Sequence, residues 1–239
     1  MHIPPIDNLI RLSTETFKQF LLAQNVLAIG GNTIYGFADN ALIGATVGID
    51  VQIEHIPVSE IKHYSAAMPQ FMAEVFQGKL VQGWQDSLTN LFALLVEKHF
   101  TGDREFKELK KCQISLDFRD KTAIVDQMKD SLLKNFDFNS SKEKIKLINS
   151  VFNPQNERES DLANINKHIQ IRNAFQHKSG KIDDFFLREL GLQRITLLDN
   201  NANPREFALN DKIELSVPEF NSFRKSVVLV AQTWRKWNG

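Results

Sequence analysis

Residues 167 to 182 read K-H-I-Q-I-R-N-A-F-Q-H-K-S-G-K-I, and they gather a cation, an amide and a titratable base into one short stretch. Leu162, Ile165 and Ile169 lead into it at spacings of three and four, which predicts an amphipathic helix. Gly180 suits the position just past a helix end. The sequence therefore predicts a short, partly buried helix whose polar end points at solvent, a partner or a substrate.

Three residues of this polar end are candidate catalytic residues. Asn173 and His177 are four residues apart, so on a helix they are neighbours on one surface. Arg172 lies five residues before His177, about 140° away around the helix, and only its long side chain could bring its charge to the same place. His168 could orient Arg172, or it could be a partly buried histidine with a backbone partner.

The pattern Arg-Asn-x-x-x-His at residues 172–177 resembles the motif of the HEPN superfamily of helical-bundle proteins. Nuclease members of that superfamily carry an arginine, a polar residue and then, after a short gap, a histidine. Residues 178–182 are similar to the glycine-containing turn of its defence-associated members. The resemblance covers about residues 80–239 and implies an antiparallel helical bundle, whereas residues 1–75 carry no such resemblance.

The resemblance implies a metal-independent endoribonuclease of toxin or antiviral-defence type. RNA carries its own nucleophile, the 2′-hydroxyl, so such an enzyme needs only to move protons and stabilise charge. His177 would act as general base or acid, and Arg172 would hold the scissile phosphate and stabilise its growing charge. Asn173 would bind the phosphate or fix the imidazole. The expected product is a 2′,3′-cyclic phosphate, with no metal and no other cofactor.

RNA is the expected partner, and the contacts expected for it are local. The formal net charge of the chain is +0 at pH 7, so no global field draws it to nucleic acid. Lys167, Lys178 and Lys181 make the motif region basic and are the candidate RNA-binding residues, although Asp183 and Asp184 offset part of this charge. The resemblance also implies a homodimer with facing motif helices, and it leaves open an antitoxin or defence-system partner protein.

Two other interpretations of the motif remain open. Several members of the superfamily are binding or assembly modules, so the chain could be a non-catalytic HEPN-like module that binds a partner protein or RNA. In a purely structural role, Arg172 and Asn173 would cap carbonyl groups at the helix C-terminus. His177 would then lie at the negative end of the helix dipole.

Competing site motifs in the sequence are weak. Glu60 and His63 lie one helical turn apart, a spacing that is more typical of a surface contact than of a metal site. Asp50, Glu60 and Lys62 match the carboxylate pair and lysine of magnesium-dependent restriction-type nucleases, but the same E-x-K pattern occurs twice elsewhere in the chain. Walker-type, dinucleotide-binding and G-x-S-x-G motifs are absent from the sequence.

Composition is that of an ordinary globular protein. The chain has 239 residues, 42% of them hydrophobic and 24% charged, which is enough for a full core. A single cysteine, Cys112, favours a reducing cytoplasm. No signal peptide or membrane-length apolar run is present in the sequence. We expect an N-terminal segment over residues 1–75, of unknown role, and a HEPN-like helical domain over residues 76–239.

The N-terminal segment is predicted to contain a helix and a strand or hairpin. Pro4-Pro5 opens the helix, its apolar positions run from Ile6 to Leu21, and Gly30-Gly31-Asn32 is expected to end it. A strand or hairpin is predicted between residues 33 and 56, because apolar residues alternate there. The alternating positions are Val47, Ile49, Val51 and Ile53.

The remaining chain is predicted to be helical with little strand. The clearest amphipathic helix follows Gly83 and ends at Thr101-Gly102-Asp103. The charged residues 104–111 are typical of a solvated helix face. Further helices are predicted over 124–136, 145–151 and 219–237, besides the motif helix, with an apolar run at 185–190, a loop at 198–204 and an extended segment at 213–215. Five or six helices make this a mainly α protein with a small N-terminal α/β extension.

Overall fold

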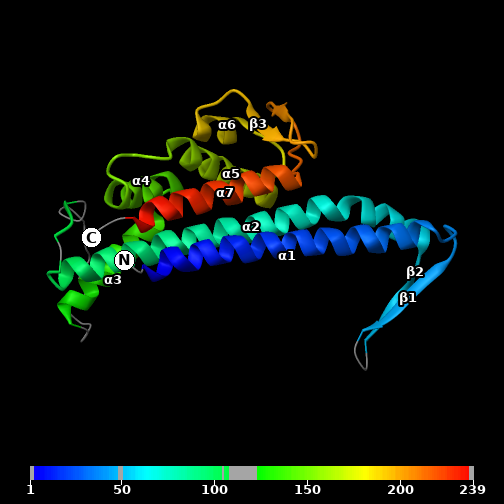
Figure 1. Ribbon diagram of the computed structural model, residues 1–239, viewed down its shortest axis with the longest axis horizontal. Helices are drawn as coiled ribbons and strands as arrows, with labels where there is room; N and C mark the ends of the chain where they lie inside the picture. The colour runs from blue at the N-terminus through cyan, green and yellow to red at the C-terminus, as the bar shows by residue number, and fades with distance from the viewer. Residues whose placement is uncertain (1–2, 48–50, 104, 108–122, 237–239) are drawn as a thin grey trace.

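The computed structural model describes residues 3–47, 51–103, 105–107 and 123–236, and within them it contains seven helices and two small antiparallel sheets (Figure 1). The predicted mainly helical class is confirmed. The helices are α1 (Pro4–Tyr35), α2 (Val58–Phe100), α3 (Ile124–Phe138), α4 (Ser141–Phe152), α5 (Glu159–Lys178), α6 (Asp184–Leu190) and α7 (Val217–Arg235). The strands are β1 (Leu42–Val47), β2 (Val51–Pro57), β3 (Ile195–Leu198) and β4 (Pro204–Phe207).

Helices α1 and α2 form a long antiparallel pair that spans the molecule (Figure 1). Gly83 lets the two helices approach closely, because a side-chain carbon there would overlap Leu12. Toward the distal end of the pair, Gln24 Nε2 donates to the carbonyl oxygen of Pro69 at 3.0 Å. This hydrogen bond joins the two helices directly beside the proline.

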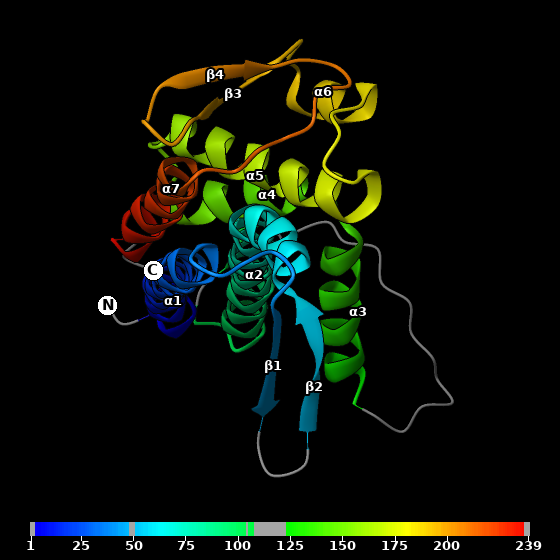
Figure 2. The same cartoon turned by 90° about the vertical axis from the view of Figure 1, so that its right-hand side faces the viewer.

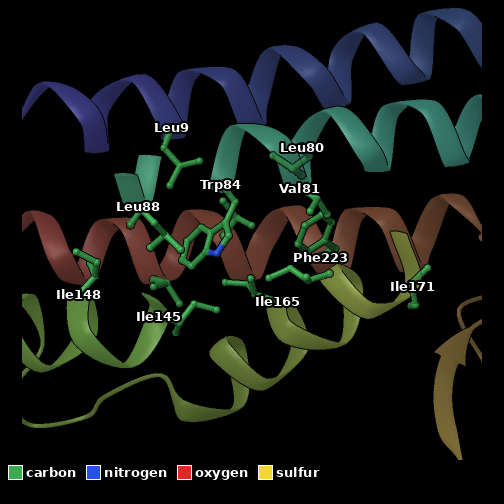
Figure 3. Packing of buried hydrophobic residues seen from close by; sticks show 14 of the residues in the cluster. Leu9, Leu80, Val81, Trp84, Leu88, Ile145, Ile148, Ile165, Ile171 and Phe223 are labelled. Carbon is green, nitrogen blue, oxygen red and sulfur yellow. The ribbon is translucent and has the colours of Figure 1, made fainter. Parts of the chain in front are cut away.

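Helices α4, α5, α6 and α7 and the β3–β4 hairpin form a body on one side of the helix pair (Figures 1 and 2). Aromatic rings join the body to the pair: Trp84 of α2 stacks on Trp234 of α7 at 5.1 Å, and Phe20 of α1 meets Phe220 of α7 edge-on at 4.9 Å. Figure 3 shows Trp84 among buried side chains of α1, α2, α4, α5 and α7. Each such buried side chain stabilises the fold by roughly 1.5–3 kcal/mol.

The predicted end of the first helix is wrong. Helix α1 continues through Gly30 and Gly31 to Tyr35. A glycine inside a helix costs only about 1 kcal/mol relative to alanine, and α2 lies alongside this part of α1. The chain turns only after Gly36, where Lys62 Nζ contacts Asp39 Oδ1 at 2.7 Å and closes the corner.

The predicted start of the second long helix is also wrong. Helix α2 begins at Val58, far upstream of Gly83, and includes Pro69 in its interior. It ends at Phe100 as predicted, with Thr101 as its C-cap. Because α2 runs without a break through residues 75 and 76, the chain continues as one helix across the predicted limit of the N-terminal segment. Ile6 of that segment belongs to the same core as Trp84.

The predicted hairpin in the N-terminal segment is confirmed as β1 and β2, which pair from Leu42↔Pro57 to Val47↔Val51. Residues Ile49 and Asp50 lie outside the described residues, as does most of the charged stretch 104–111. In Figures 1 and 2 the hairpin projects from the tip of the helix pair, on the side away from the body.

The local patterns of the C-terminal half agree well with the structure. Helices α3, α4, α5 and α7 occupy the predicted ranges, and α6 covers the apolar run at 185–190. The loop at 199–203 connects β3 to β4, a hairpin that was not predicted. Residues 213–216 are extended and follow an isolated bridge between Lys181 and Lys212. Within the described ranges, none of the helices has a stretch long and apolar enough to cross a membrane.

Candidate functional site

Helix α5 carries the motif, and its apolar stripe holds it in the body. Ile165 and Ile169 are buried in the core, as predicted, and Leu162 packs against it. The Nε2 of Gln77 in α2 donates to the backbone carbonyl of His168 at 2.7 Å. The helix is therefore anchored along two turns, while its last turn extends to the surface of the body.

The end of α5 is closed by backbone groups. Ser179 and Gly180 both adopt left-handed backbone conformations, and the N–H of Gly180 donates to the carbonyl of Ala174 at 3.0 Å. The carbonyl of Gly180 in turn accepts from Ile213 N at 2.8 Å. Across the described chain, no motif side chain donates to a carbonyl of this helix end, although His177 lies in the last turn of α5, where the structural interpretation places it.

Asn173 and His177 line one hollow between the last turns of α5 and the start of α6. The hollow has a volume of about 270 Å³. The His177 side chain is exposed, and Asn173 is half-buried one turn before it. The lining residues are Gln170, Asn173, Ala174, His177, Lys178, Asp183, Phe185 and Phe186. A base and an amide thus face a space large enough for a nucleotide fragment.

Arg172 lies beside this hollow but is not among its lining residues. Its side chain is half-buried, and its buried Nε has no hydrogen-bond partner. The Nη1 atom lies 3.5 Å from Oδ1 of Asn173, a long contact for a hydrogen bond. In the part of the chain that the structure describes, Arg172 has no ion pair, so its guanidinium is available to an anion.

The two predicted RNA contacts nearest the hollow differ in their surroundings. Lys178 Nζ lies 3.5 Å from Asp183 Oδ2, and both side chains are exposed. The N–H of Phe186 donates to Asp183 Oδ1 at 2.8 Å, and this hydrogen bond holds the pKa of the Asp183 carboxyl below its usual value. Lys181 is exposed and has no ion pair with any residue of the described ranges.

The third predicted RNA contact, Lys167, belongs to a different cluster. Its Nζ contacts Glu219 Oε1 at 2.8 Å and the carbonyl of Thr196 at 3.1 Å. His168 Nε2 donates to the same Glu219 oxygen at 3.0 Å. The charge of Lys167 is therefore already paired inside the protein, between α5, α7 and the start of β3.

His168 takes neither of the two predicted roles. Its side chain is fully buried, its ring stacks on Phe223 at 4.3 Å, and its polar partner is the carboxylate of Glu219. No hydrogen bond joins it to Arg172 in the described structure. Glu219 lies 51 residues away in sequence, so local spacing gave no sign of this pair.

Burial decides the charge state of this pair. Desolvation lowers the pKa of His168 to about 4, in spite of the hydrogen bond to Glu219, so the imidazole is neutral at pH 7. Burial alone would raise the pKa of Glu219, but the hydrogen bond from His168 and the charge of Lys167 lower it to about 2. The N–H of Leu198 also donates to Glu219, at 2.8 Å. The cluster ties α5, α7 and β3 together.

The competing motifs do not form a site in the described structure. Lys62 is held by Asp39 and by the carbonyl of Phe37, at the corner between α1 and β1. Asp50, its predicted partner along with Glu60, lies outside the described residues. Among the residues that are described, there is no group of three or more His, Cys, Asp or Glu side chains that could hold a metal ion.

Sequence reasoning missed the residues of α6 that complete the hollow. Asp183, Phe185 and Phe186 follow the motif directly, and Asp183 is the N-cap of α6. An aspartate directly before an apolar run is a recognisable N-cap signal. It could have predicted a second helix folding back on the motif.

Comparisons with protein-family models, with curated proteins and with solved structures found no match to this chain.

Proposed function

We propose that the protein is a metal-independent endoribonuclease that cleaves RNA at the hollow beside His177. The observation that carries this proposal is the pairing of Asn173 and His177, one helical turn apart, on the wall of the same 270 Å³ hollow. Arg172 lies directly beside Asn173. Base, amide and cation are the groups that cleavage by the RNA 2′-hydroxyl requires.

His177 is the proton-transfer group in this proposal. Its imidazole is exposed at the end of α5, where an incoming RNA strand can reach it. As a general base it takes the proton of the 2′-hydroxyl, whose oxygen then attacks the adjacent phosphorus. The P–O5′ bond breaks, the 5′-oxygen of the next nucleotide leaves with a proton from water, a 2′,3′-cyclic phosphate remains, and His177 then returns its proton to the solvent.

Arg172 supplies the charge that this step needs. A half-buried guanidinium without a carboxylate partner is poorly compensated, and a phosphate would satisfy it. Asn173 lies between Arg172 and the hollow, so its amide can bind the same phosphate or fix the imidazole of His177. Binding of the scissile phosphate therefore draws the arginine side chain toward the hollow.

Flanking nucleotides have two kinds of contact near the hollow. Lys178 and Lys181 offer positive charge to neighbouring phosphates, although Asp183 reduces the effect of Lys178. The Phe185 side chain is 58% exposed and lines the hollow, where it can stack on an unpaired base. We therefore propose single-stranded RNA as the substrate and exclude Lys167 from the RNA contacts, because Glu219 already pairs with it.

Purified protein incubated with total RNA in EDTA tests this proposal. We expect cleavage to proceed in EDTA and to leave 2′,3′-cyclic phosphate ends. Strict dependence on Mg²⁺ or Mn²⁺ would contradict it. RNA that is bound but stays intact would identify the protein instead as a non-catalytic HEPN-like binding module. Harm to the host on expression, lost in His177→Ala, would support the toxin or defence setting.

A further inference from the structure

The half of the α1–α2 pair nearest the β1–β2 hairpin, called the distal half here, carries apolar side chains that are exposed to solvent. On α1 they stand at positions 22, 26 and 29, and on α2 at positions 64, 68, 71 and 75. The exposed residues are Leu22, Val26, Ile29, Tyr64, Met68, Phe71 and Val75, with exposed fractions from 39% to 69%. The alternating spacings of four and three are those of the seam between helices packed side by side.

The two stripes lie at the same level and on the same face. Gln24 meets Pro69 across the pair, and Gln19 meets Lys79, so the levels of residues 22–29 and 64–75 overlap. Phe20 points at the body through Phe220. On α2, Gln70 points at the body through the N–H of Leu215. At 100° per residue, the α1 stripe lies roughly 180–240° around the helix from Phe20, and the α2 stripe lies roughly 100–160° from Gln70, so both stripes are turned away from the body.

The apolar character is confined to this distal half. Closer to the N-terminus the same face of α1 is polar, with Asn8 and an exposed ion pair between Arg11 and Glu15. On α2 it becomes polar at Gln82, which donates to Asp86. In contrast, residues 19–38 of the sequence contain no charged residue. If the whole face contacted only water, we would expect it to be polar along its entire length, and the distal half is not.

The β1–β2 hairpin points to the same side. Strand β2 continues directly into α2, and in Figures 1 and 2 the hairpin extends from the tip of the helix pair, away from the body and clear of the other described elements. An isolated two-stranded hairpin is at best marginally stable in water. The hairpin and the apolar stripes therefore lack a packing partner on the same face of the molecule.

We propose that a second copy of this chain covers this face in a two-fold dimer. The distal halves of the two helix pairs pack as four helices, and each hairpin extends along the helices of the partner. The seven exposed side chains offer on the order of 800 Å², about the area that each partner buries in a standard-size interface. A two-fold contact presents the same patch twice, so stripes of equal spacing meet.

Charge favours a second copy over other occupants. Residues 63–73 of α2, like residues 19–38 of α1, include no Asp, Glu, Lys or Arg, so two copies meet without repulsion between like charges. A helix that lies on a lipid surface typically carries Lys and Arg along its polar face. The stripes have no such basic border. This face is also on the far side of the helix pair from the His177 hollow, so the inference does not depend on the proposed ribonuclease.

Sedimentation velocity of the full chain without RNA, over a concentration series, tests the proposal. Ile29→Glu and Phe71→Glu place a charge in each stripe, and Asn8→Glu adds the same charge to the polar half of the face. We expect the wild type and Asn8→Glu to dimerise equally. The stripe variants should dimerise at least about 100-fold more weakly, because each charge is desolvated without a partner. Ile29→Ser, without a charge, should give an intermediate loss.

Far-UV circular dichroism provides the control for folding, and the substituted side chains are exposed, so the helical content should be unchanged. A wild type that stays monomeric at all concentrations would overturn the proposal. Stripe variants that dimerise as strongly as the wild type would overturn it as well. A monomer that floats with vesicles of neutral or anionic phospholipid would assign the face to a membrane surface instead.

Discussion

Two histidines of α5 have opposite environments although they are nine residues apart on one helix. His168 is fully buried and donates to Glu219, whereas His177 is exposed at the wall of the hollow. The first is held in a neutral state inside the protein, and the second is accessible from solvent, as the proton-transfer role that we propose for it requires. The difference follows from their positions on α5. His168 packs against Phe223 of α7, whereas His177 lies beyond the last buried turn of the helix.

At the residue scale, Arg172→Ala should lower the rate of RNA cleavage by about 100- to 1,000-fold, because it removes the charge that stabilises the transition state. Asn173→Ala should cost roughly tenfold, the worth of a single hydrogen bond. Initial rates on one defined RNA measure both. Arg188→Ala, on the exposed side of α6, is the matched control and should leave the rate unchanged. If Arg172→Ala, Asn173→Ala and Arg188→Ala lost the same fraction of the cleavage rate, the roles proposed for Arg172 and Asn173 would be wrong.

The buried pair predicts how stability depends on pH. Below pH 6.5 the unfolded chain protonates His168, whereas the folded protein does so only near pH 4. The free energy of unfolding should therefore fall as the pH drops from 6.5 to 4, by on the order of 3 kcal/mol. Glu219, with a folded-state pKa of about 2, adds a further fall between pH 4.5 and 2.

Urea unfolding at a series of pH values measures this dependence. His168→Gln keeps a donor for Glu219 but does not titrate, so it should flatten the stability curve between pH 6.5 and 4. The fall below pH 4.5 should remain in this variant. A wild type and a variant with the same slope between pH 6.5 and 4 would contradict the assignment of that slope to His168.

At the element scale, local patterns predicted α3, α4, α5 and α7 because each is a short amphipathic helix with its own signals. For the two long helices they predicted the start of α1 and the end of α2 correctly, but not the end of α1 or the start of α2. Gly30, Gly31 and Pro69 usually interrupt helices, but here each long helix supports the other along its length. Packing between segments 45 to 60 residues apart in sequence outweighs a local cost of a few kcal/mol, and the spacing of residues within one segment cannot reveal it.

The turn after α5 depends on Gly180. Its φ of +78° lies in the left-handed region, and a side-chain carbon there would come within 2.9 Å of the Phe175 ring. Gly180→Ala should therefore lower the free energy of unfolding by at least about 1–2 kcal/mol. Gly78→Ala is the matched control, because Gly78 lies inside α2 with open space around it.

Urea unfolding of both variants gives the comparison. Alanine is favoured over glycine inside a helix, so Gly78→Ala should stabilise the protein by up to about 1 kcal/mol. A Gly180→Ala protein as stable as the wild type would show that the turn tolerates a side chain, and the described geometry at the end of α5 would then be wrong.

At the scale of the whole molecule, the sequence predicted the three motif residues but only part of their surroundings. Asn173 and His177 lie one turn apart on one helix, so spacing alone placed them at the same hollow, whereas Arg172 lies outside its lining. The pairing of Lys167 with Glu219 depends on contact between α5 and α7, 52 residues apart in sequence, and no local pattern indicates it. The hollow itself forms only when α6 folds back on α5.

One hollow offers a single asparagine and a single histidine, with one arginine beside it, and we expect two motif helices to face each other across a two-fold axis in the active species. Phe71→Glu, which should weaken the separate contact through the α1–α2 stripes on the opposite face, tests this pairing on its own. Its specific activity should fall on dilution, and RNA should shift its sedimentation from monomer toward dimer, because phosphate relieves the repulsion between two basic patches. Undiminished specific activity of a monomer at every dilution would rule this arrangement out.

The most direct test of the central claim compares the wild type with His177→Ala on the same RNA in EDTA, with Gln176→Ala as the neighbouring exposed control. Proton transfer by a positioned side chain contributes about 100- to 10,000-fold to a rate. We predict a loss of that size in His177→Ala, wild-type activity in Gln176→Ala, and melting temperatures within about 2 °C of each other, since surface substitutions change stability little. If His177→Ala cleaves RNA as fast as the wild type per folded molecule, His177 is not the proton-transfer group and the account is wrong.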